Sequence, residues 1–313
     1  MNNHRPHSSD LTSTGPLVSV GIPTYNRPEG LRRTLECITG QTYRNLEIII
    51  SDNCSQGDQT RTVAADFIKN DSRIRYYRQK MNMGPTFNFQ FVLGQATGEY
   101  FMWAADDDEW DSIWIKKSLE EFFKNSSLSL CYSEALKKNS DGTTEILYSD
   151  ISTTGMQRLT GIKKVLLNQY RNIEFYGLIK TRIARDYQFT NSFGDDQIFI
   201  IYLSLRGEIA KTIPALFING PGFAGTSAKN TVQSLSLNRL NIYFGYIFLF
   251  FNTLRMIYSY DFGLTAWEKM KVTVFVFQKS ISRRYLLAVG FGIRMLLTDT
   301  LNVIRVETFK RIL

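Results

Sequence analysis

The sequence predicts an α/β fold with a mainly parallel sheet flanked by helices, and two observations support this prediction. Four apolar segments of strand length alternate with helical segments between residues 17 and 104. Polar and acidic residues directly follow three of these strands. The alternation is typical of right-handed βαβ units, whose ligands gather at the carboxyl ends of the strands.

The first expected strand is Leu17–Ile22 (LVSVGI), an uninterrupted apolar run of the kind found in sheets covered on both faces. A helix follows from Pro28, because proline suits the first helical turn, and it ends near Gly40. The expected elements after it are strand Leu46–Ile50, helix Thr60–Lys69, strand Ile74–Tyr77, helix Pro85–Ala96 and strand Tyr100–Ala104.

The pattern beyond Trp110 predicts fewer elements. Leu128–Tyr132 is an expected strand, and Asp141-Gly142 is a hairpin turn signal. Asp195–Arg206 is an expected helix that begins with acids and is closed by Gly207. The segment GPGFAG, residues 220–225, is expected to form a flexible loop at the border of an active site.

Composition indicates a globular protein. With 313 residues, 43% of them hydrophobic, the chain can bury one large core with an appendage. Its three cysteines form no CxxC pair and leave one over in any disulfide scheme, which favours a reducing cytoplasm. Residues 1–15 are polar and lack an apolar signal region, so we expect a flexible leader rather than a metal site built on His4 and His7.

The tail, residues 227–313, carries the whole charge surplus. It holds 12 of the 37 Lys and Arg but 4 of the 29 Asp and Glu, while the remainder of the chain is balanced. Its apolar runs, Ile242–Phe251 and Tyr285–Leu297, are shorter than the ~18 residues of a spanning helix. We therefore predict helices that lie in a membrane interface, and the alternative is a helical subdomain packed on residues 16–226.

Three consecutive acids, Asp106, Asp107 and Asp108, follow the expected strand Tyr100–Ala104. Adjacent carboxylates repel one another unless something positive joins them. A divalent cation that carries a diphosphate is a suitable partner, because hard metals bind carboxylate and phosphate oxygens together. The alternative is a solvated acidic turn.

Five segments in sequence resemble glycosyltransferase family 2, whose enzymes have the mixed α/β GT-A fold. They are VSVGIPTYNRP, LEIIISDNCSQGDQT, NMGPTFNFQFVLGQATGEY, AADDDEW and GDDQIFIIYLSLRGEI, between Val18 and about Gly207. The resemblance implies that Pro23, Thr24 and Tyr25 cradle a nucleotide base. It also implies that Asp52 accepts a hydrogen bond from the base and that Asn82 lies beside the nucleotide. A turn-forming role is the alternative for Asp52.

The family's DxD motif aligns with Ala105, Asp106 and Asp107, so alanine replaces its usual first acid. The resemblance implies that Asp107 is the main ligand of Mg²⁺ or Mn²⁺. Asp106 then contacts the ribose or the metal, and Asp108 binds the metal or orients its neighbours. A shift of one residue in the alignment would exchange these roles.

The family's final acidic motif corresponds to Asp195-Asp196. The resemblance implies that Asp196 is the general base, with Asp195 beside it in the catalytic motif. Acids are also common at helix N-termini without any catalytic role, and that is the alternative.

Together these features predict a metal-dependent, inverting glycosyltransferase, peripheral to the cytoplasmic face of the membrane. Its expected donor is a UDP- or dTDP-sugar, and its expected acceptor is a lipid-linked glycan in O-antigen or other surface polysaccharide synthesis. A non-catalytic scaffold is one alternative, because Ala105 departs from the motif. A nucleotidyltransferase is another, although PTYNRP stands where its glycine-rich loop would be. The tail suits lipid better than nucleic acid.

Overall fold

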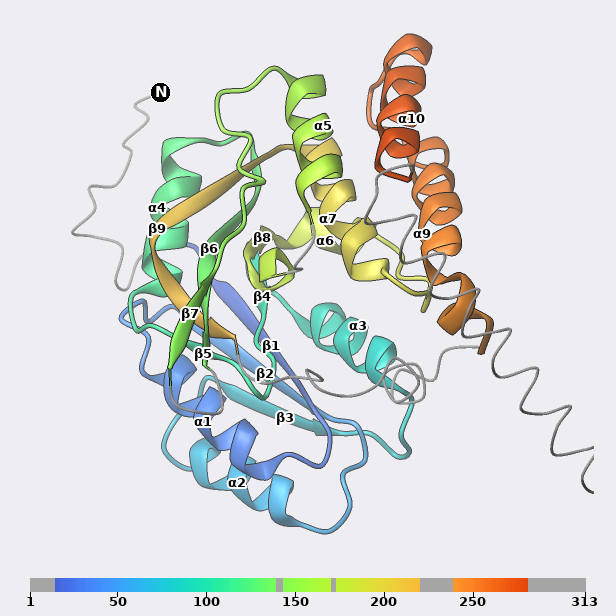
Figure 1. Ribbon diagram of the computed structural model, residues 1–313. Helices are drawn as coiled ribbons and strands as arrows, with labels where there is room; N and C mark the ends of the chain where they lie inside the picture. Colours follow the sequence, from blue (N-terminus) through green and yellow to red (C-terminus); the bar gives the residue numbers. More distant parts are fainter. Residues whose placement is uncertain (1–14, 139–142, 170–172, 220–238, 281–313) are drawn as a thin grey trace, which may run out of the picture. The chain divides into compact units, whose positions relative to one another are not determined.

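A computed structural model describes residues 15–138, 143–169, 173–219 and 239–280 (Figure 1). The chain forms two compact units. The first comprises residues 1–189 and 199–224, and the second comprises residues 190–198 and 225–313. Each unit is described separately below.

Parallel strands form the first half of the sheet in the first unit. Strand β1 (Val18–Thr24) lies between β2 (Leu46–Asp52) and β4 (Tyr100–Trp103), and β3 (Ile74–Arg78) pairs with the outer side of β2. All three pairings are parallel, so the predicted βαβ arrangement is confirmed. Their carboxyl ends consequently meet at one edge of the sheet.

Helices cover both faces of these strands because both faces are apolar. Val18, Val20 and Ile22 pack in one buried cluster with the apolar residues of α1 (Pro28–Thr39) and α2 (Gln59–Ile68). On the opposite face, Gly21 leaves room for α3 (Pro85–Gln95), because a Cβ there would lie 2.6 Å from Val92. Figure 1 shows α3 on the other side of the sheet from α1 and α2.

The second half of the sheet is mixed. Strand β4 is followed in spatial order by β8 (Leu178–Lys180), β6 (Leu128–Lys138), β9 (Glu208–Asn219) and β5 (Glu109–Trp110), and β7 (Thr144–Leu147) pairs with β6. Only β6 and β9 are parallel among these pairs. The predicted strand Leu128–Tyr132 is confirmed and extends to Lys138. Asp141-Gly142 lies outside the described residues, between antiparallel partners β6 and β7.

An aromatic cluster joins the two halves of the sheet. Trp103 is completely buried, and its ring stacks on Phe175 with centroids 4.5 Å apart. Phe199 meets the same indole edge-on at 5.6 Å. The helices between β5 and α7 along the chain are α4 (Trp114–Lys124), α5 (Arg158–Asn168), the 3₁₀ turn η1 (Ile173–Tyr176) and α6 (Thr181–Asp186). Helix α7 (Asp195–Arg206) has the bounds that the sequence predicts.

The second unit contains α9 (Arg239–Ser259) and α10 (Ala266–Ser280). The apolar segment Ile242–Phe251 is helical, as predicted, within α9. The leader, the GPGFAG loop and the segment Tyr285–Leu297 lie outside the described residues. Within the described part of the chain, no helix combines the length and the apolar character needed to cross a membrane.

Asn88 fixes the edge where β1 and β2 end. Its side chain is 3% exposed and donates from Nδ2 to the carbonyl oxygens of Ser51 at 2.9 Å and Thr24 at 3.3 Å. Its Oδ1 accepts from Ser51 Oγ at 2.5 Å. One amide from α3 thus satisfies backbone groups of two neighbouring strands.

We expect Asn88→Leu to lower the free energy of unfolding by about 3 kcal/mol, because buried carbonyl groups lose their donor. Urea unfolding would measure this loss. Asn70→Leu is a matched control, since the exposed Asn70 amide donates only to Asp66 in its own helix region. It should change stability by less than about 0.5 kcal/mol. Equal effects of both substitutions would contradict this role of Asn88.

Candidate functional site

The predicted nucleotide and metal residues of the first unit gather at the carboxyl edge of β1, β2 and β4. Thr24 ends β1 and is the register partner of Asp52, which ends β2. The Asn53 amide donates to the Thr24 carbonyl oxygen at 2.9 Å. The first acid of the acidic loop, Asp106, lies three residues after the end of β4, which pairs with the other side of β1.

Two of the three acids converge on a single cationic atom. Arg27 Nη1 donates to Asp106 Oδ1 at 3.1 Å and to Asp107 Oδ2 at 2.9 Å. Thr24 Oγ1 donates to the second oxygen of Asp106 at 2.7 Å. The loop is therefore an organised anionic site rather than a solvated turn.

Burial separates the roles of the three acids. The Asp106 side chain is 8% exposed, and desolvation raises the pKa of its carboxyl to about 6, against the opposing effect of Arg27. The Asp107 side chain is twice as exposed, at 16%. Asp108 is buried at 2%. Asp107 is consequently the acid most accessible to a ligand from solvent.

Helix α1 holds the backbone of the acidic loop, a contact that the sequence analysis did not anticipate. Thr34 Oγ1 donates to the carbonyl oxygens of Ala105 at 3.0 Å and Asp108 at 3.3 Å. A Cβ at Gly30 would lie 1.9 Å from the carbonyl oxygen of Asp106. Gly30 and Thr34 are four residues apart on one face of α1, and Arg27 directly precedes the helix, so this spacing was the available signal.

Asp52 is held at the edge of the sheet by its own hydrogen bonds. Its Oδ1 accepts from the Ser55 amide at 2.7 Å, and its Oδ2 accepts from the Tyr76 hydroxyl at 2.7 Å. Arg78 Nε lies 4.0 Å from the same oxygen. The side chain is 1% exposed, yet a carboxylate has lone pairs beyond those used here.

Asparagines connect the loops around Asp52. Asn53 Nδ2 donates to Asn82 Oδ1 at 2.9 Å and to the Gly84 carbonyl oxygen at 3.1 Å. The Asn26 amide donates to Ser55 Oγ at 2.8 Å. The predicted residue Asn82 therefore lies beside the Asp52 loop, while Pro23 is buried within β1 and Tyr25 remains 38% exposed.

The predicted catalytic acids begin α7 and belong to the second unit. Asp195 is 8% exposed, and its Oδ2 accepts from the amides of Thr190 at 2.5 Å and Asn191 at 3.1 Å. Asp196 is half-buried, and its Oδ1 accepts from the Gln197 amide at 2.8 Å. Asp195 thus orders the loop before α7, whereas Asp196 is the more exposed of the two.

The family model described as Glycosyl transferase family 2 matches residues 19–187. A GalNAc(5)-diNAcBac-PP-undecaprenol beta-1,3-glucosyltransferase from Campylobacter jejuni is 27% identical over 265 residues, which cover 83% of this chain and 82% of the relative. A Bacillus subtilis protein named as the teichuronic acid biosynthesis glycosyltransferase TuaG is 31% identical over 133 residues. That match covers 42% of this chain and 52% of TuaG, about half of the relative.

Solved structures share the fold at low sequence identity. TarS from S. aureus in complex with UDP-GlcNAc gives a TM-score of 0.60 at 14% identity, over 88% of this chain and 80% of that one. The mannosyltransferase PcManGT from Pyrobaculum calidifontis, with GDP-Man and Mn²⁺, gives 0.54 at 13% identity, over 92% and 87%. The predicted GT-A fold is confirmed.

We expect Gly30→Ala to lower the free energy of unfolding by about 1–3 kcal/mol, because the added methyl group overlaps the Asp106 carbonyl oxygen. Gly94→Ala in α3 is the matched control, since a Cβ there meets nothing within 4 Å. A Gly30→Ala protein with unchanged stability would contradict the close approach of α1.

Proposed function

We propose that this chain, which belongs to glycosyl transferase family 2, transfers a sugar from a nucleoside diphosphate to a glycan acceptor. The convergence of Asp106 and Asp107 on one cationic atom is the observation that most supports this function. It places paired carboxylates beside Thr24 and the Asp52 loop, where the resemblance expects the donor.

The two carboxylates suit a divalent cation, Mg²⁺ or Mn²⁺. Their oxygens already face the same positive nitrogen at 3.1 and 2.9 Å, so they point toward a common centre. Among the described residues, no group of three or more His, Cys, Asp or Glu side chains is arranged to hold a metal. Phosphate oxygens of the donor would therefore complete the ligand set, as Mg²⁺ sites commonly require.

The loops after β1 and β2 supply the proposed nucleotide site. Asp52 is fixed by Ser55 and Tyr76 before any ligand arrives, so its carboxylate can accept an imide N–H of uracil or thymine at low entropic cost. Tyr25 is exposed beside this loop and offers an aromatic face to the base. A UDP- or dTDP-sugar is accordingly the proposed donor, and the solved neighbour TarS binds UDP-GlcNAc.

Transfer is proposed to proceed in one step with inversion at the anomeric carbon. Asp196 accepts the proton of the acceptor hydroxyl while that oxygen forms its bond to the anomeric carbon. The bond to the departing phosphate oxygen breaks, and its electron pair leaves with the nucleoside diphosphate. A bound divalent cation would stabilise the negative charge on this leaving group. Asp195, held by the amides of Thr190 and Asn191, would fix the start of α7 from which Asp196 extends.

The second unit presents apolar side chains for contact with a membrane. In α9, Phe248, Phe251 and Tyr258 are 36%, 59% and 57% exposed, and Trp267 and Phe277 in α10 are 61% and 56% exposed. Their spacing puts each set on one helix face. Lys269 and Lys271 lie over the Tyr258 and Trp267 rings at 5.9 and 5.3 Å. This combination suits an anionic membrane interface, and with it a cytoplasmic peripheral location.

The acceptor is proposed to be a lipid-linked glycan in surface polysaccharide synthesis. The name of the Campylobacter relative includes a PP-undecaprenol acceptor, and its match covers most of both chains. Contact with a membrane would place the enzyme next to such a substrate. The nucleotidyltransferase alternative gains nothing from the family match, and the scaffold alternative predicts no donor hydrolysis or transfer.

We expect Asp107→Ala to abolish Mn²⁺-dependent stabilisation by UDP and dTDP, measured as a thermal shift. Asp196→Asn should retain that stabilisation but reduce transfer by at least about 100-fold, because it removes the proposed base. Asp186→Asn, at the exposed end of α6, is the control for charge. Donor-dependent transfer at the parent rate by both site variants would refute these assignments.

We also expect the protein to co-sediment with vesicles that contain anionic phospholipid and to release at high salt. Replacing Phe251, Trp267 and Phe277 by serine should reduce the bound fraction severalfold, because the aromatic contact is lost. Serine at Ile68 and Ile146, exposed in the first unit, is the control. Binding that persists after the α9 and α10 substitutions would exclude these helices as the membrane contact.

A further inference from the structure

Arg27 occupies the position between the two carboxylates at which the proposed divalent cation would bind. Its Nη1 atom is the shared donor to Asp106 and Asp107. Burial of the guanidinium lowers its pKa, and the two carboxylates outweigh this effect, so the pKa is raised overall. Arg27 therefore remains charged, and a metal ion must displace it or share the carboxylates with it.

Contacts besides those with Arg27 hold the Asp106 carboxylate and the acidic loop. Thr24 holds one oxygen of Asp106, and Thr34 binds the loop backbone at Ala105 and Asp108. Gly30 lets α1 lie against the Asp106 carbonyl oxygen. The loop backbone and Asp106 would consequently keep their positions if the guanidinium moved away, whereas the Asp107 side chain would lose its contact with Arg27.

The Arg27 side chain is placed so that it can exchange partners. It is 35% exposed, against 8% for Asp106, and it extends from the residue that precedes α1 rather than from the helix interior. A guanidinium also pairs well with phosphate oxygens, often through two parallel hydrogen bonds. When a metal ion with its diphosphate binds the two carboxylates, the diphosphate oxygens offer Arg27 new hydrogen-bond acceptors.

We propose that Arg27 is a built-in counter-cation that competes with free divalent metal and yields its place to a metal–diphosphate complex. This inference rests on the proposed metal and donor site. It makes Arg27 a positioning residue: in the absence of donor it neutralises Asp106 and Asp107, and with donor bound it contacts the diphosphate. The metal then binds tightly only together with the nucleotide.

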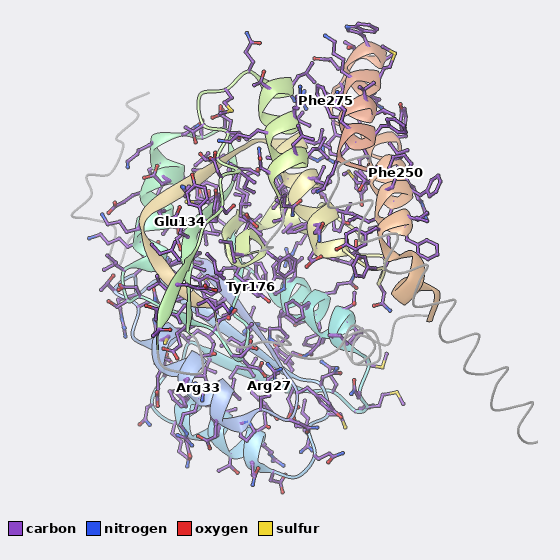
Figure 2. All side chains as sticks on the ribbon, in the orientation of Figure 1. Arg27, Arg33, Glu134, Tyr176, Phe250 and Phe275 are labelled. Atoms are coloured by element: carbon purple, nitrogen blue, oxygen red, sulfur yellow. The ribbon has the colours of Figure 1, made fainter. Side chains whose placement is uncertain are left out.

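The test measures free Mn²⁺ by electron paramagnetic resonance, without activity as a readout. Arg27→Gln should bind Mn²⁺ alone about tenfold more tightly than the parent protein, because a competing cation has been removed. Arg33→Gln is the matched control: it removes the same charge from the exposed side of α1 and should behave like the parent (both arginines are labelled in Figure 2).

UDP provides the second arm. The parent should bind Mn²⁺ at least tenfold more tightly with UDP than without it, whereas Arg27→Gln should gain severalfold less, because its diphosphate contact is gone. Arg27→Lys, which keeps the charge without the planar fork, should lie between them. Thermal unfolding monitors the fold of each variant.

Each outcome is decisive. Equal Mn²⁺ affinity of the parent and Arg27→Gln in the absence of UDP overturns the competition. If the parent then still shows UDP-dependent Mn²⁺ binding, the proposed donor site stands and this inference alone fails. If Mn²⁺ binds to no variant with or without UDP, the metal site and the inference fail together. A loss of fold specific to Arg27→Gln leaves Arg27→Lys, whose UDP-dependent gain in Mn²⁺ affinity must be smaller than that of the parent, and an equal gain overturns the diphosphate contact.

Discussion

The site depends on placing two adjacent carboxylates, the buried Asp106 and the partly exposed Asp107, just after a core strand. Carboxylates so placed repel each other and lose hydration, so they need a cation and fixed hydrogen-bond donors. The protein supplies Arg27 as the cation and Thr24 as a donor, from the loop and strand that precede α1. This electrostatic requirement ties the acidic loop to β1 and α1 and leaves a centre where a donor diphosphate and its metal can replace the guanidinium.

The sheet brings the side chains of the site together because its parallel strands end at one common carboxyl edge. Thr24, Asp52 and the acidic loop come from three strands that are neighbours in space. Asn88 donates hydrogen bonds to backbone carbonyl oxygens at the ends of β1 and β2, and Thr34 donates to backbone carbonyl oxygens of the acidic loop. The binding groups are thus fixed by buried contacts, while Tyr25 and Asp107 retain exposure toward solvent.

The apolar runs of β1, β2 and β4 could be predicted from sequence because each is a nearly continuous buried segment. Strands β8 and β5 have three and two residues, too short to carry a pattern, so the mixed half of the sheet could not be assigned. The site acids were predicted from their order along the chain. The contact of Arg27 with Asp107 was not, because it joins positions 80 residues apart and depends on tertiary packing.

The proposed chemistry requires a divalent cation and a nucleoside diphosphate to bind together at Asp106 and Asp107. Anomalous diffraction from crystals grown with Mn²⁺ and UDP tests this joint binding. We expect a manganese peak bound to an Asp107 oxygen and to both phosphates, with uracil at Asp52 and the Arg27 guanidinium turned toward the diphosphate. UDP bound at this edge with Arg27 still between the carboxylates and no manganese peak, or manganese at another place, would contradict it.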